Sequence, residues 1–228
     1  MSYKIPIIIN NMNLLEWPSK MVQDCKTFEN VGDIIIVDNG STYEPLLDWY
    51  KTKPCEIIYS KNLGNLCPWI LYIPQERNYE YYVVTDPDLD LSKTPSNCLI
   101  FLKEKMEKYN EFDYIGLSLS NYKQPINNPY HYHLSTWGYH NWENSKLEDG
   151  LLLNQIVDTT FAMYKNTRHH RGKSCATNTP YSAEHLPWNI TNEDLKNLKE
   201  SNFEFYNYLL NAEGSCSYKK FVNFELFK

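Results

Sequence analysis

The chain has 228 residues and a mass of 27.0 kDa, which is enough for one sizeable α/β domain. Its formal net charge of −6 argues against a protein that grips a nucleic-acid backbone, because no basic surplus exists to displace counterions. No stretch approaches the roughly 20 apolar residues of a membrane-spanning helix, and the N-terminal apolar run is too short for a signal peptide. We therefore expect no direct membrane insertion.

Two features of the composition bear on environment and ligand. The six cysteines form no CxxC pair or short-range cluster, which predicts reduced, mostly buried thiols and a cytoplasmic location: Cys25, Cys55, Cys67, Cys98, Cys175 and Cys216. Aromatic residues make up 15% of the chain, with 19 Tyr. Rings in this number suit sugar or nucleobase surfaces, and they serve equally as core.

The first half of the chain alternates strand and helix signals. Continuous apolar, β-branched runs predict strands at 5–9, 33–37, 56–59 and 81–85. Helices are expected over 14–28 and 44–50, and a further helix follows Pro95, with Thr94 or Ser96 as its cap and Cys98, Phe101, Leu102 and Met106 on one face. This alternation predicts a right-handed, wound, mostly parallel sheet whose ligand binds at the carboxyl ends of the strands.

The second half is less regular. Strands are expected at 114–119 and 159–164, a loop over 165–188 and a terminal helix over 192–211, whereas the polar, ring-rich stretch 121–149 has no clear period. Neither a repeat nor a low-complexity linker divides the chain. We expect a single domain over 1–228, with a nucleotide-binding half at 1–120 and an acceptor-binding half at 121–228.

Three carboxylates alternate directly after the strand at 81–85: Asp86, Asp88 and Asp90. An EF-hand calcium loop that began at Asp86 would need Gly at its sixth position and Glu at its twelfth, and these positions hold Leu91 and Asn97. A capping cluster would account for Asp90 alone. Hard oxygen ligands for a divalent ion that holds a diphosphate therefore remain as the interpretation.

Several motifs occur together in a familiar order. VDNGS at 37–41, NLG at 62–64 and DPD at 86–88 are followed by VDTTFAMY at 157–164 and AEHLPW at 183–188. In this order they resemble the GT-A nucleotide-sugar glycosyltransferases, family 2 type, and are similar to small GT-A domains of algal-virus glycosyltransferases. The resemblance covers roughly residues 5–190.

The resemblance implies a GT-A fold, with a Rossmann-like, mostly parallel central sheet flanked by helices and an irregular acceptor-side second half. It also implies a metal-dependent, inverting transfer of a sugar from a nucleotide-diphosphate donor, UDP-sugar favoured, to a glycan hydroxyl. Mn²⁺ or Mg²⁺ would neutralise the charge that grows on the leaving diphosphate. Asp88 would bind the metal, Asp86 would contact the ribose or a metal-bound water, and Asp90 would cap the next helix or support the metal ligands.

By the same resemblance, the donor nucleotide contacts residues at the strand ends and the following turns: Asn10, Asn11, Asp38, Asn39, Asn62, Gly64 and Asp86. Asp38 would accept a hydrogen bond from the base or ribose. An Asx turn after the strand accounts for Asp38 equally well, and the two roles are compatible. The glycine at position 64 would allow close approach of the backbone.

The catalytic base, which takes the proton of the acceptor hydroxyl, is predicted to be Asp158. Glu148 and Asp149 are rivals that also suit a plain solvated pair. His185 either completes the metal shell or is a packed, satisfied ring. The basic segment 169–173 is either a lid that brings Arg171 or Lys173 to the diphosphate or an exposed turn.

The ring-rich stretch suggests an acceptor platform, because aromatic rings stack on the CH faces of sugars. We expect the acceptor to contact His133, Trp137 and Trp188. A non-catalytic carbohydrate-binding module and a sugar-phosphate nucleotidyltransferase remain as alternatives. The second normally carries a Gly-rich, Lys/Arg-bearing loop after its first strand, where this chain has asparagines at 10, 11 and 13. The eight glycines never approach GxGxxG spacing, which excludes a Rossmann oxidoreductase. The sequence does not indicate an oligomeric state.

Overall fold

The fold is described from a computed structural model, which covers residues 3–120, 146–153, 157, 161–166, 172–186, 192–203 and 206–207. Four of the predicted site residues lie outside these ranges: His133, Trp137, Asp158 and Trp188. The helices are α1 (Glu16–Cys25), α2 (Glu44–Lys51), α3 (Cys67–Ile70), α4 (Ile73–Glu76), α5 (Cys98–Lys108) and α8 (Asn192–Ser201).

The strands form two sheets. The main sheet has the order β3-β2-β1-β4-β10-β6-β11-β9-β8 and consists of β1 (Ile5–Asn11), β2 (Val31–Asn39), β3 (Glu56–Ser60), β4 (Tyr81–Thr85), β6 (Tyr114–Gly116), β8 (Leu147–Glu148), β9 (Leu151–Leu152), β10 (Ala162–Lys165) and β11 (Ser174–Thr177). The smaller sheet has the order β5-β12-β7 and consists of β5 (Leu89–Asp90), β7 (Ser118–Ser120) and β12 (Ser182–His185).

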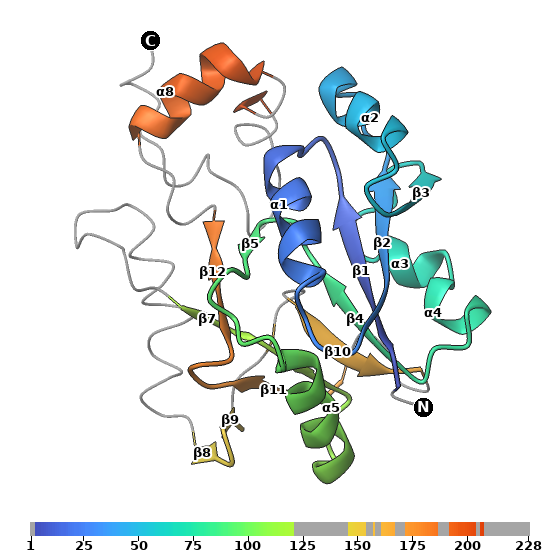
Figure 1. The fold of residues 1–228 in the computed structure, drawn as a ribbon, viewed down its shortest axis with the longest axis vertical. Coiled ribbons are helices and arrows are strands. Elements are labelled where there is room, and N and C mark those ends of the chain that lie inside the picture. Colours follow the sequence, from blue (N-terminus) through green and yellow to red (C-terminus); the bar gives the residue numbers. More distant parts are fainter. Residues whose placement is uncertain are drawn as a thin grey trace.

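The four strands β3, β2, β1 and β4 run parallel, and β10 joins them antiparallel to β4 (Figure 1). Alternate side chains of β1 enter two separate cores: Ile7 and Ile9 pack with α1, α2 and α5 on one face, and Ile8 packs with α3 and α4 on the other. A strand covered on both faces must be apolar at every position, which explains the unbroken isoleucine run. The predicted α/β fold with a mostly parallel central sheet is confirmed.

Part of the high tyrosine content serves the core. On the face of the sheet that α3 covers, the Tyr164 ring stacks between Tyr82 and Tyr114, with centroid distances of 5.6 and 4.9 Å. The Trp69 indole meets Tyr164 edge-on and donates its Nε1–H to the Tyr82 hydroxyl at 3.2 Å. Burial raises the pKa of Tyr82 to about 12, although that hydrogen bond lowers it. The rings of this cluster are therefore structural.

The region predicted as a loop at 165–188 instead contains β11 and β12. The predicted strand at 114–119 is also two strands, because the chain leaves the main sheet after Gly116 and enters the smaller sheet at Ser118. Leu117 lies between them and donates its N–H to the Phe161 carbonyl at 3.2 Å. The smaller sheet thus branches from the main sheet beside the start of β10.

The predicted cap of α5 is wrong. The helix begins at Cys98, and its N-terminal flanking residue Asn97 makes no side-chain capping bond. Thr94 is occupied elsewhere, because its hydroxyl donates to the Ser182 carbonyl at 2.8 Å, and the Ser96 hydroxyl donates to Glu29 at 2.8 Å. Both hydroxyls therefore bond to residues far along the chain and do not cap α5.

Two further expectations concern the described part of the chain. Its five cysteines are free thiols, and all except Cys55 are buried, as predicted. None of its helices combines the length and the apolar character needed to cross a bilayer.

Candidate nucleotide and metal site

The carboxyl ends of the first strands bring the predicted donor residues into one row. Asn11 of β1 is in register with Asp38 of β2, and Asp38 is in register with Tyr59 of β3. On the other side of β1, Ile9 is in register with Thr85, which directly precedes Asp86. Residues in register project from the same face of a sheet, so this row extends along the sheet edge where an open α/β fold binds its ligand. Tyr59, which the sequence analysis missed, is 63% exposed here.

Asp38 forms the predicted Asx turn. Its Oδ1 accepts a hydrogen bond from the Ser41 N–H at 2.9 Å, and the residue is only 3% exposed. The second oxygen, Oδ2, is buried and accepts no hydrogen bond from the described residues. A buried carboxylate oxygen is costly without a donor. The turn role therefore uses only Oδ1, and the carboxylate also lies close enough to the Tyr50 hydroxyl to raise the pKa of Tyr50.

Asn11 braces the sheet edge from inside. Its side chain is fully buried, and Nδ2 donates to the Leu14 carbonyl at 2.9 Å and to the Tyr50 hydroxyl at 2.8 Å. Burial, together with the nearby Asp38 carboxylate, raises the pKa of Tyr50 well above its usual range despite the Asn11 bond. The Asn11 NH₂ group is thus committed to α2 and to the loop that leads into α1, whereas its buried Oδ1 accepts no hydrogen bond from the described residues. The neighbouring Asn10 donates to the Gly64 carbonyl at 3.4 Å.

The predicted turn at 62–64 is held against the end of β2. The buried Asn39 side chain donates to the Gly64 carbonyl at 3.0 Å and accepts from the Leu63 N–H at 2.7 Å. Asn62 accepts the Gly64 N–H at 3.0 Å within the turn. Asn39 and Asn62 therefore shape the backbone at the sheet edge.

Gly40 is required at the tip of the turn after β2. Its φ of +85° lies in the left-handed region, and a Cβ there would lie 2.8 Å from the Asn62 backbone nitrogen. Gly64 also has a positive φ of +77°, but a Cβ on it would meet nothing within 4 Å. The two glycines thus differ in kind: Gly40 permits close packing of two loops, and Gly64 leaves open space beside the strand ends.

Asn13 links the loops after β1 and β2, a role that the sequence analysis did not assign. Its N–H donates to the Ser41 hydroxyl at 2.9 Å, and its Oδ1 accepts from the N–H groups of Thr42 and Tyr43 at 2.7 and 3.0 Å. Its φ of +56° is one that asparagine tolerates better than most residues. The side chain replaces a local cap at the start of α2, where Tyr43 offers none.

The smaller sheet brings His185 to the acidic triplet. Strand β12 pairs antiparallel with β5, and the Leu186 N–H donates to the Asp88 carbonyl at 2.9 Å. The His185 Nε2 then lies 3.3 Å from the Asp88 Oδ2, and both side chains are 11% exposed. At this distance a nitrogen lone pair and a carboxylate oxygen repel each other unless a proton or a cation lies between them.

The residues present fit a divalent cation. The Asp88 Oδ1 is buried and accepts no hydrogen bond from the described residues. A carboxylate and an imidazole together suit Mn²⁺, while Mg²⁺ would rely on the carboxylate and retain more water. No group of three or more His, Cys, Asp or Glu side chains converges within the described ranges, so diphosphate oxygens and water would complete the shell. Asp86, half-buried, follows β4 directly, and its carbonyl accepts from the Thr85 hydroxyl at 2.9 Å.

Asp90 does not cap α5. Its Oδ1 accepts from the Lys20 ammonium at 2.8 Å and from the Ser92 N–H at 2.9 Å. Partial burial alone would raise its pKa, but these hydrogen bonds and the Lys20 charge lower it to about 2. The ion pair therefore ties β5 to α1 and anchors the strand that follows Asp88.

Of the candidate bases, Glu148 and Asp149 lie within the described residues and Asp158 does not. Phe161, three positions further on, donates its N–H to the Thr85 hydroxyl at 3.2 Å, immediately before the acidic triplet. The rivals are part of the β8–β9 hairpin, and the lysines of α5, Lys105 and Lys108, bind Asp149 at 2.7 and 2.8 Å.

This hairpin is remote from β4. Three strands separate β4 from β9 in the sheet, which places β9 about 19 Å away at ~4.8 Å per strand. Hydrogen bonds from the two α5 lysines lower the pKa of Asp149 to about 2, and a hydrogen bond from Lys146 lowers that of Glu148. These ion pairs favour a structural role for both carboxylates.

Lys173 lies at the wrong edge for a lid over the diphosphate. The next residue, Ser174, is in register with Tyr114 of β6. Tyr114 is in register with Tyr164 of β10, and Tyr164 is in register with Tyr82 of β4, so Ser174 lies at the level of Tyr82 in the sheet. That level is the amino end of β4, whereas Asp86 and Asp88 follow its carboxyl end. The Lys173 backbone instead exchanges hydrogen bonds with Asp113, and its ammonium lies 4.9 Å from the Phe112 ring centroid. Arg171 lies outside the described residues.

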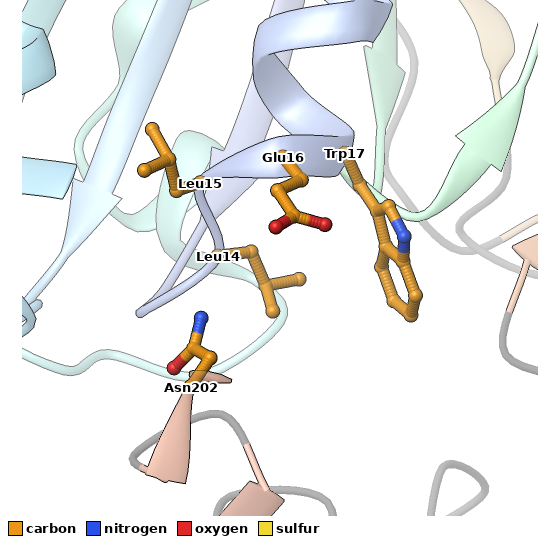
Figure 2. A pocket seen from close by; sticks show the side chains of 5 residues that line it. All are labelled: Leu14, Leu15, Glu16, Trp17 and Asn202. Carbon is orange, nitrogen blue, oxygen red and sulfur yellow. The ribbon is translucent and has the colours of Figure 1, made fainter. Parts of the chain in front are cut away.

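A small cavity lies beside the start of α1. Figure 2 shows its walls: Leu14, Leu15, Glu16 and Trp17 from the entry to the helix, and Asn202 from the end of the α8 segment. Its volume is about 10 Å³, close to the least that one water needs. The cavity marks where the C-terminal segment packs against the loop after β1.

Comparison with solved structures identifies the architecture. S. aureus TarS is 12% identical with a TM-score of 0.50, covering 95% of this chain and 41% of that chain; its 1–349 fragment is 10% identical with a TM-score of 0.51, covering 95% and 68%. Two other structures overlap less well, both below a TM-score of 0.5. They are M. tuberculosis glucosyl-3-phosphoglycerate synthase in complex with Mn²⁺ and UDP (9%, 0.45, covering 72% and 57%) and 4-diphosphocytidyl-2C-methyl-D-erythritol synthase (14%, 0.40, covering 72% and 76%).

No family model matches the sequence, and no curated protein does. The chain spans less than half the length of the longer TarS chain. Identities near 10% establish the fold alone. The chain has the GT-A type of α/β fold, as its sequence motifs predicted.

Proposed function

We propose that the protein is a metal-dependent glycosyltransferase. It transfers a sugar from a nucleoside diphosphate, UDP favoured, to a hydroxyl of a glycan acceptor with inversion at the sugar carbon. The observation that carries the proposal is the contact of His185 with Asp88. It forms because β12, which contains His185, pairs with β5, the strand that begins directly after Asp88. The buried Oδ1 of Asp88, which accepts no hydrogen bond from the described residues, supports it, because a cation would satisfy that oxygen.

Each residue has a role in the proposal. Asp38 accepts a hydrogen bond from the base or ribose, and the turn that Asn39 and Gly40 hold lets the nucleotide approach the backbone. Asp88 and His185 hold Mn²⁺ or Mg²⁺, and Asp86 contacts the ribose or a metal-bound water. When bound, the ion supplies positive charge against the departing diphosphate.

Asp158 removes the proton of the acceptor hydroxyl as that oxygen attacks the sugar carbon. Support comes from Phe161, whose bond to Thr85 keeps the entry of β10 next to the acidic triplet. His133, Trp137 and Trp188 form the acceptor platform in this proposal, the whole chain acts as one domain, and the free thiols favour the cytoplasm.

Calorimetry of UDP binding with and without Mn²⁺ tests the proposal. We expect Mn²⁺ to strengthen UDP binding in the wild type and to have no such effect in Asp88→Asn. Asp48→Asn, which alters an exposed carboxylate on α2, is the matched control and should behave as wild type. Metal-linked UDP binding that survives in Asp88→Asn would exclude the assigned metal site.

The same titration separates a carbohydrate-binding module from an enzyme, and an assay of pyrophosphate release separates the nucleotidyltransferase. A carbohydrate-binding module gains no nucleotide affinity from metal. A nucleotidyltransferase would release pyrophosphate from a nucleoside triphosphate and a sugar phosphate. Against it, the loop after β1 holds Asn13 in a bracing role and offers no basic residue between positions 12 and 15.

A further inference from the structure

Three buried polar side chains meet where β1 and β2 end, on the face of the sheet that α2 covers. Asn11 is fully buried, and Asp38 and Tyr50 are only 3% and 2% exposed. Asn11 and Asp38 are in register on neighbouring parallel strands, so both side chains leave the same face of the sheet, and the strands lie about 4.8 Å apart. Tyr50 reaches the pair from α2 and bonds to Asn11 at 2.8 Å. The end of the sheet and the helix beside it thus enclose one polar cluster.

The bonds of Asn11 determine what the Tyr50 hydroxyl can still do. The Asn11 NH₂ group donates one hydrogen to the Tyr50 oxygen at 2.8 Å and the other to the Leu14 carbonyl at 2.9 Å. Tyr50 therefore accepts from Asn11, and its own O–H remains available to donate. The Asn11 Oδ1 cannot be its acceptor, because a hydroxyl that accepts from an amide NH₂ group holds its hydrogen away from that amide.

The Asp38 carboxylate is the acceptor beside this hydroxyl. Burial raises the pKa of Tyr50 well above its usual range, and the nearby Asp38 carboxylate raises it further. The Asp38 Oδ2 is buried, and no hydrogen bond from another described residue reaches it. Oδ1 is held on the other side by the Ser41 N–H at 2.9 Å. A bond from Tyr50 to Oδ2 would fix the carboxylate at both oxygens, and each oxygen would retain a second lone pair.

We propose that Tyr50 is a positioning residue for Asp38, and that Asn11 orients the Tyr50 hydroxyl for this task. The hydroxyl donates to Asp38 Oδ2 while Ser41 donates to Oδ1, so the carboxylate cannot turn about its Cβ–Cγ bond. Its remaining lone pairs then face the donor nucleotide before that nucleotide binds, which lowers the entropy lost on binding. Asn11 and Tyr50 act through Asp38 and do not touch the nucleotide. The inference rests on the proposed function, which gives Asp38 its ligand.

A double-mutant cycle on UDP binding tests the inference. UDP is titrated by calorimetry, with Mn²⁺ present, onto the full wild-type chain and onto Tyr50→Phe, Asp38→Ala and the double variant. Tyr50→Phe should weaken UDP binding by about tenfold, which is the lower end of the cost of a lost hydrogen bond to a charged group. In the Asp38→Ala background the same substitution should change UDP affinity by less than about twofold, because the hydroxyl then has no carboxylate to hold.

Two controls distinguish positioning from a structural role. Tyr82→Phe also removes a buried hydroxyl that accepts from an N–H group, that of Trp69 at 3.2 Å, but Tyr82 lies in the core on the other face of the sheet, so this variant should leave UDP affinity unchanged. In place of Tyr50, para-aminophenylalanine restores an N–H donor and should bring UDP affinity back to near the wild-type level. The analogue para-fluorophenylalanine fills the same space with no hydrogen to donate, and it should not restore UDP binding.

The outcomes are distinct. If Tyr50→Phe binds UDP as tightly as the wild type does, or loses as much affinity in the Asp38→Ala background, Tyr50 does not position Asp38, and the proposed function is unaffected. A loss of the same size in Tyr82→Phe has the same meaning. The two analogues of Tyr50 decide the matter if thermal melting shows that either single variant is unfolded. If the wild type binds no UDP, both the proposed function and the positioning role are overturned.

Discussion

The imidazole of His185 lies 3.3 Å from the carboxylate of Asp88, although the two residues come from different halves of the chain. The contact depends on the antiparallel pairing of β12 with β5 and on the backbone bond from Leu186 to Asp88. Asp88 follows β4 directly, but its contact with His185 requires a partner from the second half of the chain. The smaller sheet is therefore the device that assembles this pair.

Replacement of His185 by Gln should weaken Mn²⁺-dependent UDP binding. We expect a loss of at least about tenfold, since even residues that merely support a metal ligand cost about 10- to 100-fold. The amide keeps the size of the side chain, so the fold should persist. Calorimetry with Mn²⁺ checks this, and UDP binding without metal is the internal control. Unchanged metal dependence would show that His185 is a packed ring.

Asp158→Asn and Asp149→Asn should separate the catalytic base from its rival. Loss of a general base costs about 10²–10⁴-fold in rate, so Asp158→Asn should lower kcat by that factor and leave UDP affinity intact. Asp149→Asn removes ion pairs to Lys105 and Lys108 on an exposed hairpin and should leave kcat near wild type. Sugar transfer is measured by UDP release with an acceptor. The reverse pattern would assign the base to the hairpin.

Gly40→Ala should destabilise the protein more than Gly64→Ala. Both glycines have positive φ, so each substitution should cost about 1–2 kcal/mol in backbone strain. Only at position 40 does the new Cβ meet backbone, the Asn62 nitrogen at 2.8 Å, so this variant must also shift the 62–64 turn. Urea denaturation of both variants gives the comparison. Equal losses would show that the turn moves freely.

Tyr50→Phe should lower the free energy of unfolding by about 1–2 kcal/mol, because the buried hydroxyl accepts a hydrogen bond from Asn11 at 2.8 Å. Tyr59→Phe is the matched control. Its ring is 63% exposed, and loss of a surface hydroxyl should change stability by less than about 0.5 kcal/mol. Denaturant midpoints provide the test, and equal stability of Tyr50→Phe and wild type would contradict the bracing role of Asn11.

The Lys20–Asp90 pair should make stability depend on pH in acid. The pKa of Asp90 is about 2 in the folded protein against an ordinary 3.8, so its contribution is complete above pH 3.8 and is lost as the pH falls towards 2. Because the pair is partly exposed, we expect about 1 kcal/mol. Asp90→Asn should lack this part of the acid slope, and Asp48→Asn should retain it. Unfolding free energies from pH 5 to pH 2 decide the matter.

The sequence predicted the strands and turns of residues 5–90 well, because their signals are local. The buried runs of β1, β2 and β4 could only be strands covered on both faces, and the turn after Val37 carries its own geometry in Asp38 and Gly40. Asp88 was assigned from its place after such a strand. These features need no knowledge of distant contacts.

The second half was less predictable for a physical reason. Strands β11 and β12 read SCAT and SAEH, four residues each without apolar alternation, and they are strands because neighbours pair with them. The predicted loop at 165–188 was wrong for this reason. Of the two readings of the segment 169–173, the position of Lys173 favours the exposed turn over the lid. Hydroxyls of Thr94 and Ser96 likewise serve partners far along the chain rather than the helix beside them.

Strand β12 lies between β5 and β7 in the smaller sheet, and both of these strands are synthesised well before it. A nascent chain, which folds from its N-terminus, can complete the parallel half while Asp88 still lacks its imidazole neighbour. The order of synthesis thus makes the contact between Asp88 and His185 one of the last to form, and a product that stops short of residue 182 would keep its β1–β4 scaffold without it.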